Sequence, residues 1–177
     1  MTRNLLVATV ALLIPMAAPT AVTQSSPDGA IVVHHFPIAA SPQAAWNVLV
    51  HPELWWPSDH TWSGDRANLR MEAQAGGCFC ENWGESSAEH GRIVMAQPGK
   101  LLRIRGALGP LQDMAVTGVL TVKLNATASG STEATVTYRV SGDASHKLDA
   151  FIPAVDHVIG QQFGAFAAYA STPKPAP

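Results

Sequence analysis

The stretch that decides the fold reads FIPAVDHVIGQQFGAFAAY and covers residues 151–169. Its large apolar side chains recur every three or four positions, the spacing of one face of an α-helix. The residues of this stripe are Phe151, Val155, Val158, Ile159, Phe163 and Phe166. A long helix with one apolar face needs an apolar surface to cover, so the rest of the chain has to supply one.

The residues before this helix alternate between apolar and polar side chains from Ala67 onward, which predicts β-strands. Clusters of glycine, proline and serine divide this region into six strands. The expected strands are residues 68–73, 78–83, 90–96, 101–105, 115–126 and 132–141. Because the connections between them are short, successive strands should run antiparallel as a meander.

A seventh strand and two short helices are expected upstream of the meander. Residues 30–38 are rich in β-forming side chains, and Ser41-Pro42 is a typical helix start. His51-Pro52 interrupts that helix before a further turn at residues 53–56, and residues 57–66 are expected to form an irregular loop. The order predicts an α+β helix-grip fold, in which a curved seven-stranded antiparallel sheet, two short helices and the long C-terminal helix enclose a cavity.

Several short motifs agree with this fold in their order and spacing. They are residues 38–49 with 51–56, the Gly-Gly-x-Phe-x-Glu run at 76–81, and the hairpin formed by 90–94 and 98–102. Together they resemble the START/Bet v 1-like superfamily (SRPBCC), which includes the polyketide cyclase and dehydrase proteins and the activators of heat-shock ATPases. The resemblance covers nearly the whole chain after the first two dozen residues. It implies a cavity between the sheet and the long helix that receives a small apolar molecule.

The N-terminus has the plan of an export signal, with Arg3 followed by an apolar run at residues 5–16 and then by small residues. The run is 12 residues long, whereas a membrane-spanning helix needs about 20. We therefore expect a signal peptide at residues 1–24, no stable membrane anchor, and a periplasmic or secreted protein. Small residues allow cleavage after Thr20 or after Thr23. The mature domain should cover residues 25–170, followed by a disordered tail at 171–177.

The charge of the chain bears on its partners, and the spacing of its two cysteines bears on their bonding. The 11 basic and 13 acidic residues give a net charge of −2 without a basic cluster, which argues against nucleic acid as a partner. Cys78 and Cys80 share one face of a strand at about 6–7 Å, a spacing that would strain a bond between them. The sequence therefore predicts free or intermolecular thiols. The oligomeric state stays open.

The resemblance places one face of the strands, the loop after the second helix and the long helix around the cavity. Large apolar side chains at plausible inner positions are the candidate ligand contacts, although the same residues serve equally well as core packing. The candidates are Trp55, Trp56, Trp62, Phe79, Trp83, Met114, Tyr138, Phe163 and Phe166, together with the carboxylate Glu81.

Three polar residues are candidates for acid–base chemistry: Glu81, His90 and Tyr138. Strand alternation puts Glu81 on the apolar face beside Phe79, where a carboxylate needs a partner. His90 on the next strand is one such partner, and Arg103 or Arg105 is the structural alternative. The histidines lack the spacing of a zinc site, and no phosphate loop or Gly-x-Ser-x-Gly elbow is present, so neither metal nor cofactor is expected.

Three alternative functions are compatible with these residues. The first is an exported binding protein that holds a lipid, polyketide-like or aromatic molecule in the cavity. The second is a cyclase-like or hydrolase-like enzyme that uses the same cavity. The third is a protein-interaction module similar to the heat-shock ATPase activators, which an export signal disfavours because the ATPase is cytosolic.

Overall fold

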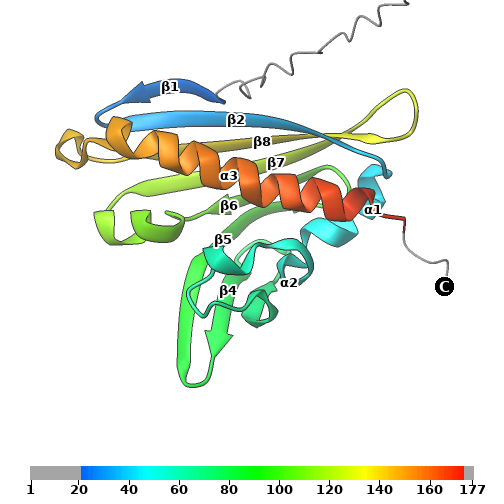
Figure 1. Ribbon diagram of the computed structural model, residues 1–177, viewed down its shortest axis with the longest axis horizontal. Coiled ribbons are helices and arrows are strands. Elements are labelled where there is room, and N and C mark those ends of the chain that lie inside the picture. The colour runs from blue at the N-terminus through cyan, green and yellow to red at the C-terminus, as the bar shows by residue number, and fades with distance from the viewer. Residues whose placement is uncertain (1–20, 174–177) are drawn as a thin grey trace, which may run out of the picture.

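The computed structural model describes residues 21–173 and has an α+β fold in which one antiparallel sheet packs against a long C-terminal helix (Figure 1). The sheet has eight strands in the order β1-β2-β8-β7-β6-β5-β4-β3. In chain order, they are β1 Val22–Ser26, β2 Gly29–Ile38, β3 Leu69–Met71, β4 Cys78–Trp83, β5 Ser86–Gln97, β6 Leu101–Arg105, β7 Thr117–Ala126 and β8 Thr132–Ser141. The α-helices are α1 Pro42–Leu49, α2 Pro52–Trp55 and α3 Leu148–Ser171, and short 3-10 helices form at η1 Ser58–His60, η2 Arg66–Asn68, η3 Gly109–Met114 and η4 Ala144–His146.

The expected strand count of seven is wrong by one, because β1 was missed. This strand pairs antiparallel with β2, from Val22 opposite Val32 to Ser26 opposite Gly29. Its middle three residues are all exposed, so it carries no apolar alternation that a sequence pattern could reveal. Most of the expected signal peptide, residues 1–20, lies outside the described residues, as does the tail from residue 174. The last residues of that expected segment, 22–24, belong to β1.

The meander itself follows the expected alternation. β8 shows it most clearly, because alternate side chains from Thr132 to Val140 are buried while those between them are more accessible. The buried face of the sheet meets α3, which crosses it obliquely in Figure 1. No helix within residues 21–173 is long and apolar enough to span a membrane.

The two short helices close one end of the sheet. Ser41 caps α1 by accepting a hydrogen bond from the Ala44 amide at 3.3 Å, and Pro42 occupies the first turn. α2 is a single turn that ends at Trp55, whose indole N–H donates to the Val48 carbonyl at 2.9 Å. Trp55 is thereby fixed between α1 and α3.

The long helix α3 begins three residues before the expected apolar stretch and ends at Ser171. Phe163 and Phe166 are fully buried, whereas Phe151, at the N-terminal end of the stripe, is 46% exposed. Gly160 lies against His34 of β2, whose ring carbon Cε1 would be 3.1 Å from an added Cβ. A side chain at position 160 would therefore need the His34 ring to shift by a few tenths of an ångström.

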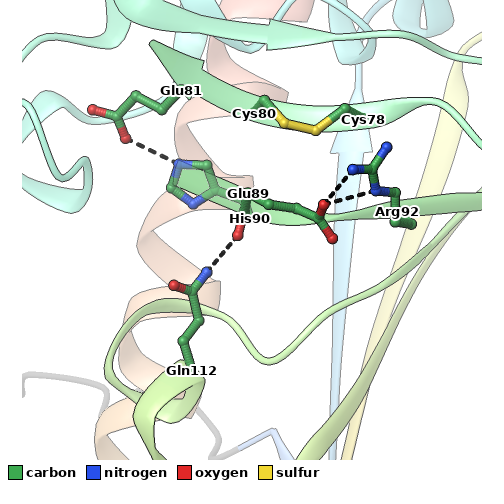
Figure 2. Close-up of a disulfide and its surroundings, with 7 residues drawn as sticks. All are labelled: Cys78, Cys80, Glu81, Glu89, His90, Arg92 and Gln112. Atoms are coloured by element: carbon green, nitrogen blue, oxygen red, sulfur yellow. Dashed lines mark hydrogen bonds and ion pairs between the residues drawn. A yellow bond between two sulfur atoms is a disulfide. The ribbon is translucent and has the colours of Figure 1, made fainter. Parts of the chain in front are cut away.

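Cys78 and Cys80 form a disulfide within β4, which corrects the expectation of free or intermolecular thiols (Figure 2). Their Cα atoms are 5.4 Å apart, inside the usual range for a disulfide and shorter than about 6.7 Å for alternate residues of a regular strand. The pairing of β4 with β5 is irregular between Phe79 and Cys80. The expectation fails because it assumed the Cα spacing of a regular strand, and β4 is shorter than that between Cys78 and Cys80.

Candidate functional site

A cavity of about 390 Å³ lies between α3, the loop after α2, η3 and the buried face of the sheet. Its volume lies within the range of small-molecule pockets, about 300–1,000 Å³. Its wall is mostly apolar. The lining residues are Trp56, Asp59, His60, Thr61, Trp62, His90, Leu108, Gly109, Pro110, Leu111, Met114, Tyr138, Phe151, Ala154, Val155, Val158, Ile159 and Gln162.

A β-bulge in β5 turns His90 toward the cavity. Phe79 pairs with Gly91 and Cys80 pairs with Glu89, so His90 is the extra residue on its strand. His90 and Gly91 are consequently both buried, although they are neighbours in a strand. A Cβ on Gly91 would lie 2.7 Å from the Ile104 side chain. Glycine at position 91 is what lets β5 bulge against β6.

η3, which forms part of the cavity wall, is tied to the same bulge. The side-chain amide of Gln112 donates to the Glu89 carbonyl at 2.7 Å (Figure 2). Glu89 also pairs with Arg92 through its carboxylate on the outer side of the strand. The bulge therefore fixes both the His90 ring and one wall of the cavity.

Glu81 is completely buried on β4, with its carboxylate held by three donors. The amides of Trp62 and Ser63 donate at 3.0 and 2.5 Å, and His90 Nε2 lies 3.0 Å from the same carboxylate. Burial raises the pKa of Glu81, but the hydrogen bonds from Ser63, Trp62 and His90 outweigh it and hold the pKa below its ordinary value. Arg103, proposed from the sequence as an alternative partner, instead donates to Thr121.

The Glu81 contact also fixes the tautomer of His90. An ionised carboxylate only accepts hydrogen bonds, so Nε2 carries the proton and Nδ1 keeps a lone pair. Burial lowers the pKa of His90, and the Glu81 carboxylate offsets this only in part. The ring stacks on Phe79 at a centroid distance of 4.9 Å and contacts Trp56 at 6.5 Å. At neutral pH, the cavity is therefore lined by a neutral imidazole with a free acceptor.

Tyr138 lines the cavity, but its hydroxyl is already engaged. It accepts a hydrogen bond from the Leu108 amide at 3.0 Å and donates to the Gly106 carbonyl at 3.2 Å. Burial raises the pKa of Tyr138 to about 12, with the Leu108 hydrogen bond acting in the opposite direction. The hydroxyl therefore holds the connection between β6 and η3 in place.

The structure brings together some of the candidate ligand contacts and leaves others in the core. Those that line the cavity are Trp56, Trp62, Met114 and Tyr138, with His90 from the acid–base candidates. Trp55, Phe79, Phe163 and Phe166 are buried in the hydrophobic core, and Glu81 lies behind His90. Trp83 is half-buried at the end of β4, outside the cavity lining.

Sequence reasoning placed α3 at the cavity but chose Phe163 and Phe166 as its contacts, whereas the residues that line the cavity lie nearer the N-terminal end of the helix. Val155, Val158 and Ile159 lie on the predicted stripe, but periodicity cannot separate residues that line a cavity from residues that fill a core. Gln162 did carry a signal, because it is an amide next to Phe163 on a face that is otherwise apolar. Within residues 21–173, no three His, Cys, Asp or Glu side chains gather into a metal-binding group.

The comparisons with known proteins identify the fold alone. No family model and no curated protein match the sequence. An uncharacterised protein from Rhizobium leguminosarum superposes with a TM-score of 0.60 at 13% identity, covering 81% of this chain and 95% of that one. A protein of unknown function from Staphylococcus aureus gives 0.58 at 12% identity, with 81% and 94% covered.

A Bet v 1-like protein is also among the structural neighbours. Norcoclaurine synthase of Thalictrum flavum, solved as a point mutant with a transition-state analogue, gives a TM-score of 0.55 at 13% identity, with 83% of this chain and 97% of that one covered. At 13% identity this likeness shows a shared fold alone. The cavity described above is defined by residues of this chain.

Proposed function

We propose that this protein is an exported binding protein that encloses a small apolar or amphipathic molecule. The observation that carries the proposal is the cavity of about 390 Å³ with its mostly apolar wall. A lipid, a polyketide-like compound or an aromatic compound fits that chemistry, since burial of its apolar surface provides the driving force. The titratable residues in the lining are Asp59, His60, His90 and Tyr138.

The proposal is tested by asking whether the purified protein contains a bound small molecule. We expect native mass spectrometry of the mature protein to show an unmodified small molecule that organic solvent extracts. Val158→Trp fills the cavity from α3 and should abolish retention, whereas Val94→Trp, at an exposed position on β5, should leave it unchanged. Equal retention by both variants would place the molecule elsewhere and contradict the proposal.

Export is part of the proposal, and β1 favours one of the two cleavage positions. Cleavage after Thr23 would remove Val22 from the strand, together with Ala21, whose carbonyl accepts from the Val33 amide at 2.8 Å. Cleavage after Thr20 leaves both residues in place. We therefore expect the mature N-terminus at Ala21, as measured by intact mass of protein recovered outside the cytoplasm. Recovery of full-length protein in the cytoplasm alone would contradict export.

A second candidate function is supported by the contact between Glu81 and His90. A neutral imidazole whose Nε2–H is held by a carboxylate resembles the base of many enzymes, because its Nδ1 can take a proton from a bound molecule. In a cyclase-like or hydrolase-like reaction, the extracted molecule would be chemically altered after incubation with the wild type. It should remain intact with His90→Gln. An unaltered molecule in both samples would favour binding alone.

A further inference from the structure

The disulfide between Cys78 and Cys80 lies on the face of the sheet opposite the one that α3 covers. The two cysteines alternate along β4 with Phe79 and Glu81, which are completely buried, whereas both cysteines are partly exposed. Neither cysteine lines the cavity described above. The bond is therefore open to a molecule in solution, at a place separate from the cavity.

Charged side chains on the neighbouring strands border the bond. On β5, Arg92 pairs in register with Cys78 and Glu89 pairs with Cys80, while on β3, Arg70 lies opposite Cys80. Residues directly opposite each other on neighbouring strands share a face of the sheet. Arg92 and Glu89 form an ion pair on this face (Figure 2). A polar, open sheet surface of this kind is accessible to a flexible polypeptide.

The bond is coupled only weakly to the fold. It joins residues two positions apart in one strand, so it restricts the unfolded chain little. A disulfide and a fold favour each other by the same factor, because the two equilibria are linked. For so short a loop that factor is about tenfold, so the fold does little to keep the bond closed. Structural disulfides of secreted proteins, in contrast, resist reduction by glutathione.

The chain has no other cysteine than these two. A thiol that exchanges with the disulfide must therefore come from another molecule. Once one sulfur has bonded to that molecule, the other cysteine is two positions away and can displace it. The chain thus carries an accessible disulfide in which each cysteine can resolve a mixed disulfide formed at the other.

We propose that Cys78 and Cys80 form a thiol–disulfide exchange site that oxidises exposed dithiols of other polypeptides. A thiolate of the polypeptide attacks one sulfur of the pair, forms a mixed disulfide with it and releases the other sulfur as a thiolate. The second thiol of the polypeptide loses its proton, attacks the mixed disulfide and releases the remaining cysteine. The polypeptide loses two electrons and two protons, and the pair becomes two thiols. Glutathione disulfide reoxidises the pair by the reverse steps and leaves as two glutathione thiols.

Reduction of the folded protein is the first test. The protein is incubated with millimolar reduced glutathione, quenched and alkylated, and its intact mass shows how many cysteines are modified. We expect both cysteines to be modified without denaturant, while the circular dichroism stays that of the folded protein. A bond that resists glutathione until the protein is unfolded would overturn the inference.

Turnover is the second test. A peptide with two reduced cysteines is mixed with glutathione disulfide, and its oxidation is followed by mass. A substoichiometric amount of wild type should raise the rate about fivefold or more, whereas Cys78→Ala/Cys80→Ala should not raise it. Wild type that is reduced and alkylated while folded is a second blocked form, should the double variant not fold. Equal rates with wild type and a blocked form would overturn the inference and leave the proposed binding function untouched.

Discussion

The two halves of α3 have the same apolar pattern but different surroundings. In the C-terminal half, Phe163 and Phe166 pack against Trp55 at centroid distances of 5.6 and 5.3 Å. In the N-terminal half, Val155 and Val158 line the cavity. The difference comes from what the rest of the chain brings to each half. The short helices fill the space under one half with aromatic rings, and η3 stands away from the other. An apolar helix face therefore predicts that the face is covered, but it does not predict whether side chains or a cavity lie against it.

The largest contrast between the halves should appear in stability. Trp55→Ala removes a ring that contacts two phenylalanines, and we expect a loss of about 3–5 kcal/mol in the free energy of unfolding. Val158→Ala removes side-chain atoms that already border open space, and its cost should be about 0.5 kcal/mol. Urea denaturation of ligand-free protein measures both. Equal losses would show that the N-terminal half is packed as tightly as the C-terminal half.

A smaller loss of stability is expected on acidification, because of His90 and Glu81. The pKa of His90 is lowered in the folded protein, so the unfolded chain binds the proton first as the pH falls below 6.5. The free energy of unfolding should therefore fall from that pH down to the folded pKa. Glu81 has its pKa lowered from 4.5, so its stabilising contribution should be lost below that value as the pH falls through its folded pKa.

Urea denaturation between pH 8 and pH 4 measures this dependence. His90→Gln should remove the upper part of the decline, whereas His157→Gln, at an exposed position on α3, should leave it in place. An identical pH dependence in wild type and His90→Gln would show that burial of this ring is not linked to stability.

Glycine substitutions compare the bulged wall with the packed helix. A Cβ at Gly91 would meet the Ile104 side chain and the Arg105 carbonyl within 2.8 Å. We expect Gly91→Ala to destabilise the protein by about 1–3 kcal/mol. Gly164→Ala has room, since its nearest contact would be Phe36 at 3.9 Å, and should be neutral or stabilising by about 1 kcal/mol. The reverse order in thermal denaturation would show that β5 does not need its bulge.

Removal of the disulfide should have a modest effect on stability. It closes a loop between residues only two positions apart, so it restricts the unfolded chain little. The double variant Cys78→Ala/Cys80→Ala should lose about 1.5 kcal/mol, or about 3–6 °C in melting temperature for a domain of this size. Wild type with a reductant should match the variant. A much larger loss would mean that the bond supports more than local strand geometry.

The meander was predictable because its strands alternate and its turns contain glycine or proline. Three strands, β4, β6 and β8, have the expected bounds. β1 was not predictable, since its side chains are exposed and its stability comes from pairing with β2. The disulfide was not predictable from strand periodicity, because periodicity assumes regular Cα spacing and the 5.4 Å between the Cα atoms of Cys78 and Cys80 is shorter than that.

The candidate site was predictable in its residue types more than in its geometry. The pairing of Glu81 with His90 followed from alternation across a hairpin, and the structure places them 3.0 Å apart. The inward turn of His90 depends on a bulge that one strand alone does not reveal. Tyr138 was taken as a candidate acid or base, yet its two hydrogen bonds depend on residues thirty or more positions away. Contacts of that sequence separation are set by the tertiary fold.

The pairing of β1 with β2 has a consequence for self-association. β2 is a ten-residue strand, and without β1 one of its edges would present unpaired amides and carbonyls to any other chain. β1 covers the first part of that edge, and it is itself short, with three exposed polar residues at its centre. Loss of a few N-terminal residues would therefore turn a protected strand into a template for edge-to-edge aggregation, even though no core residue is removed.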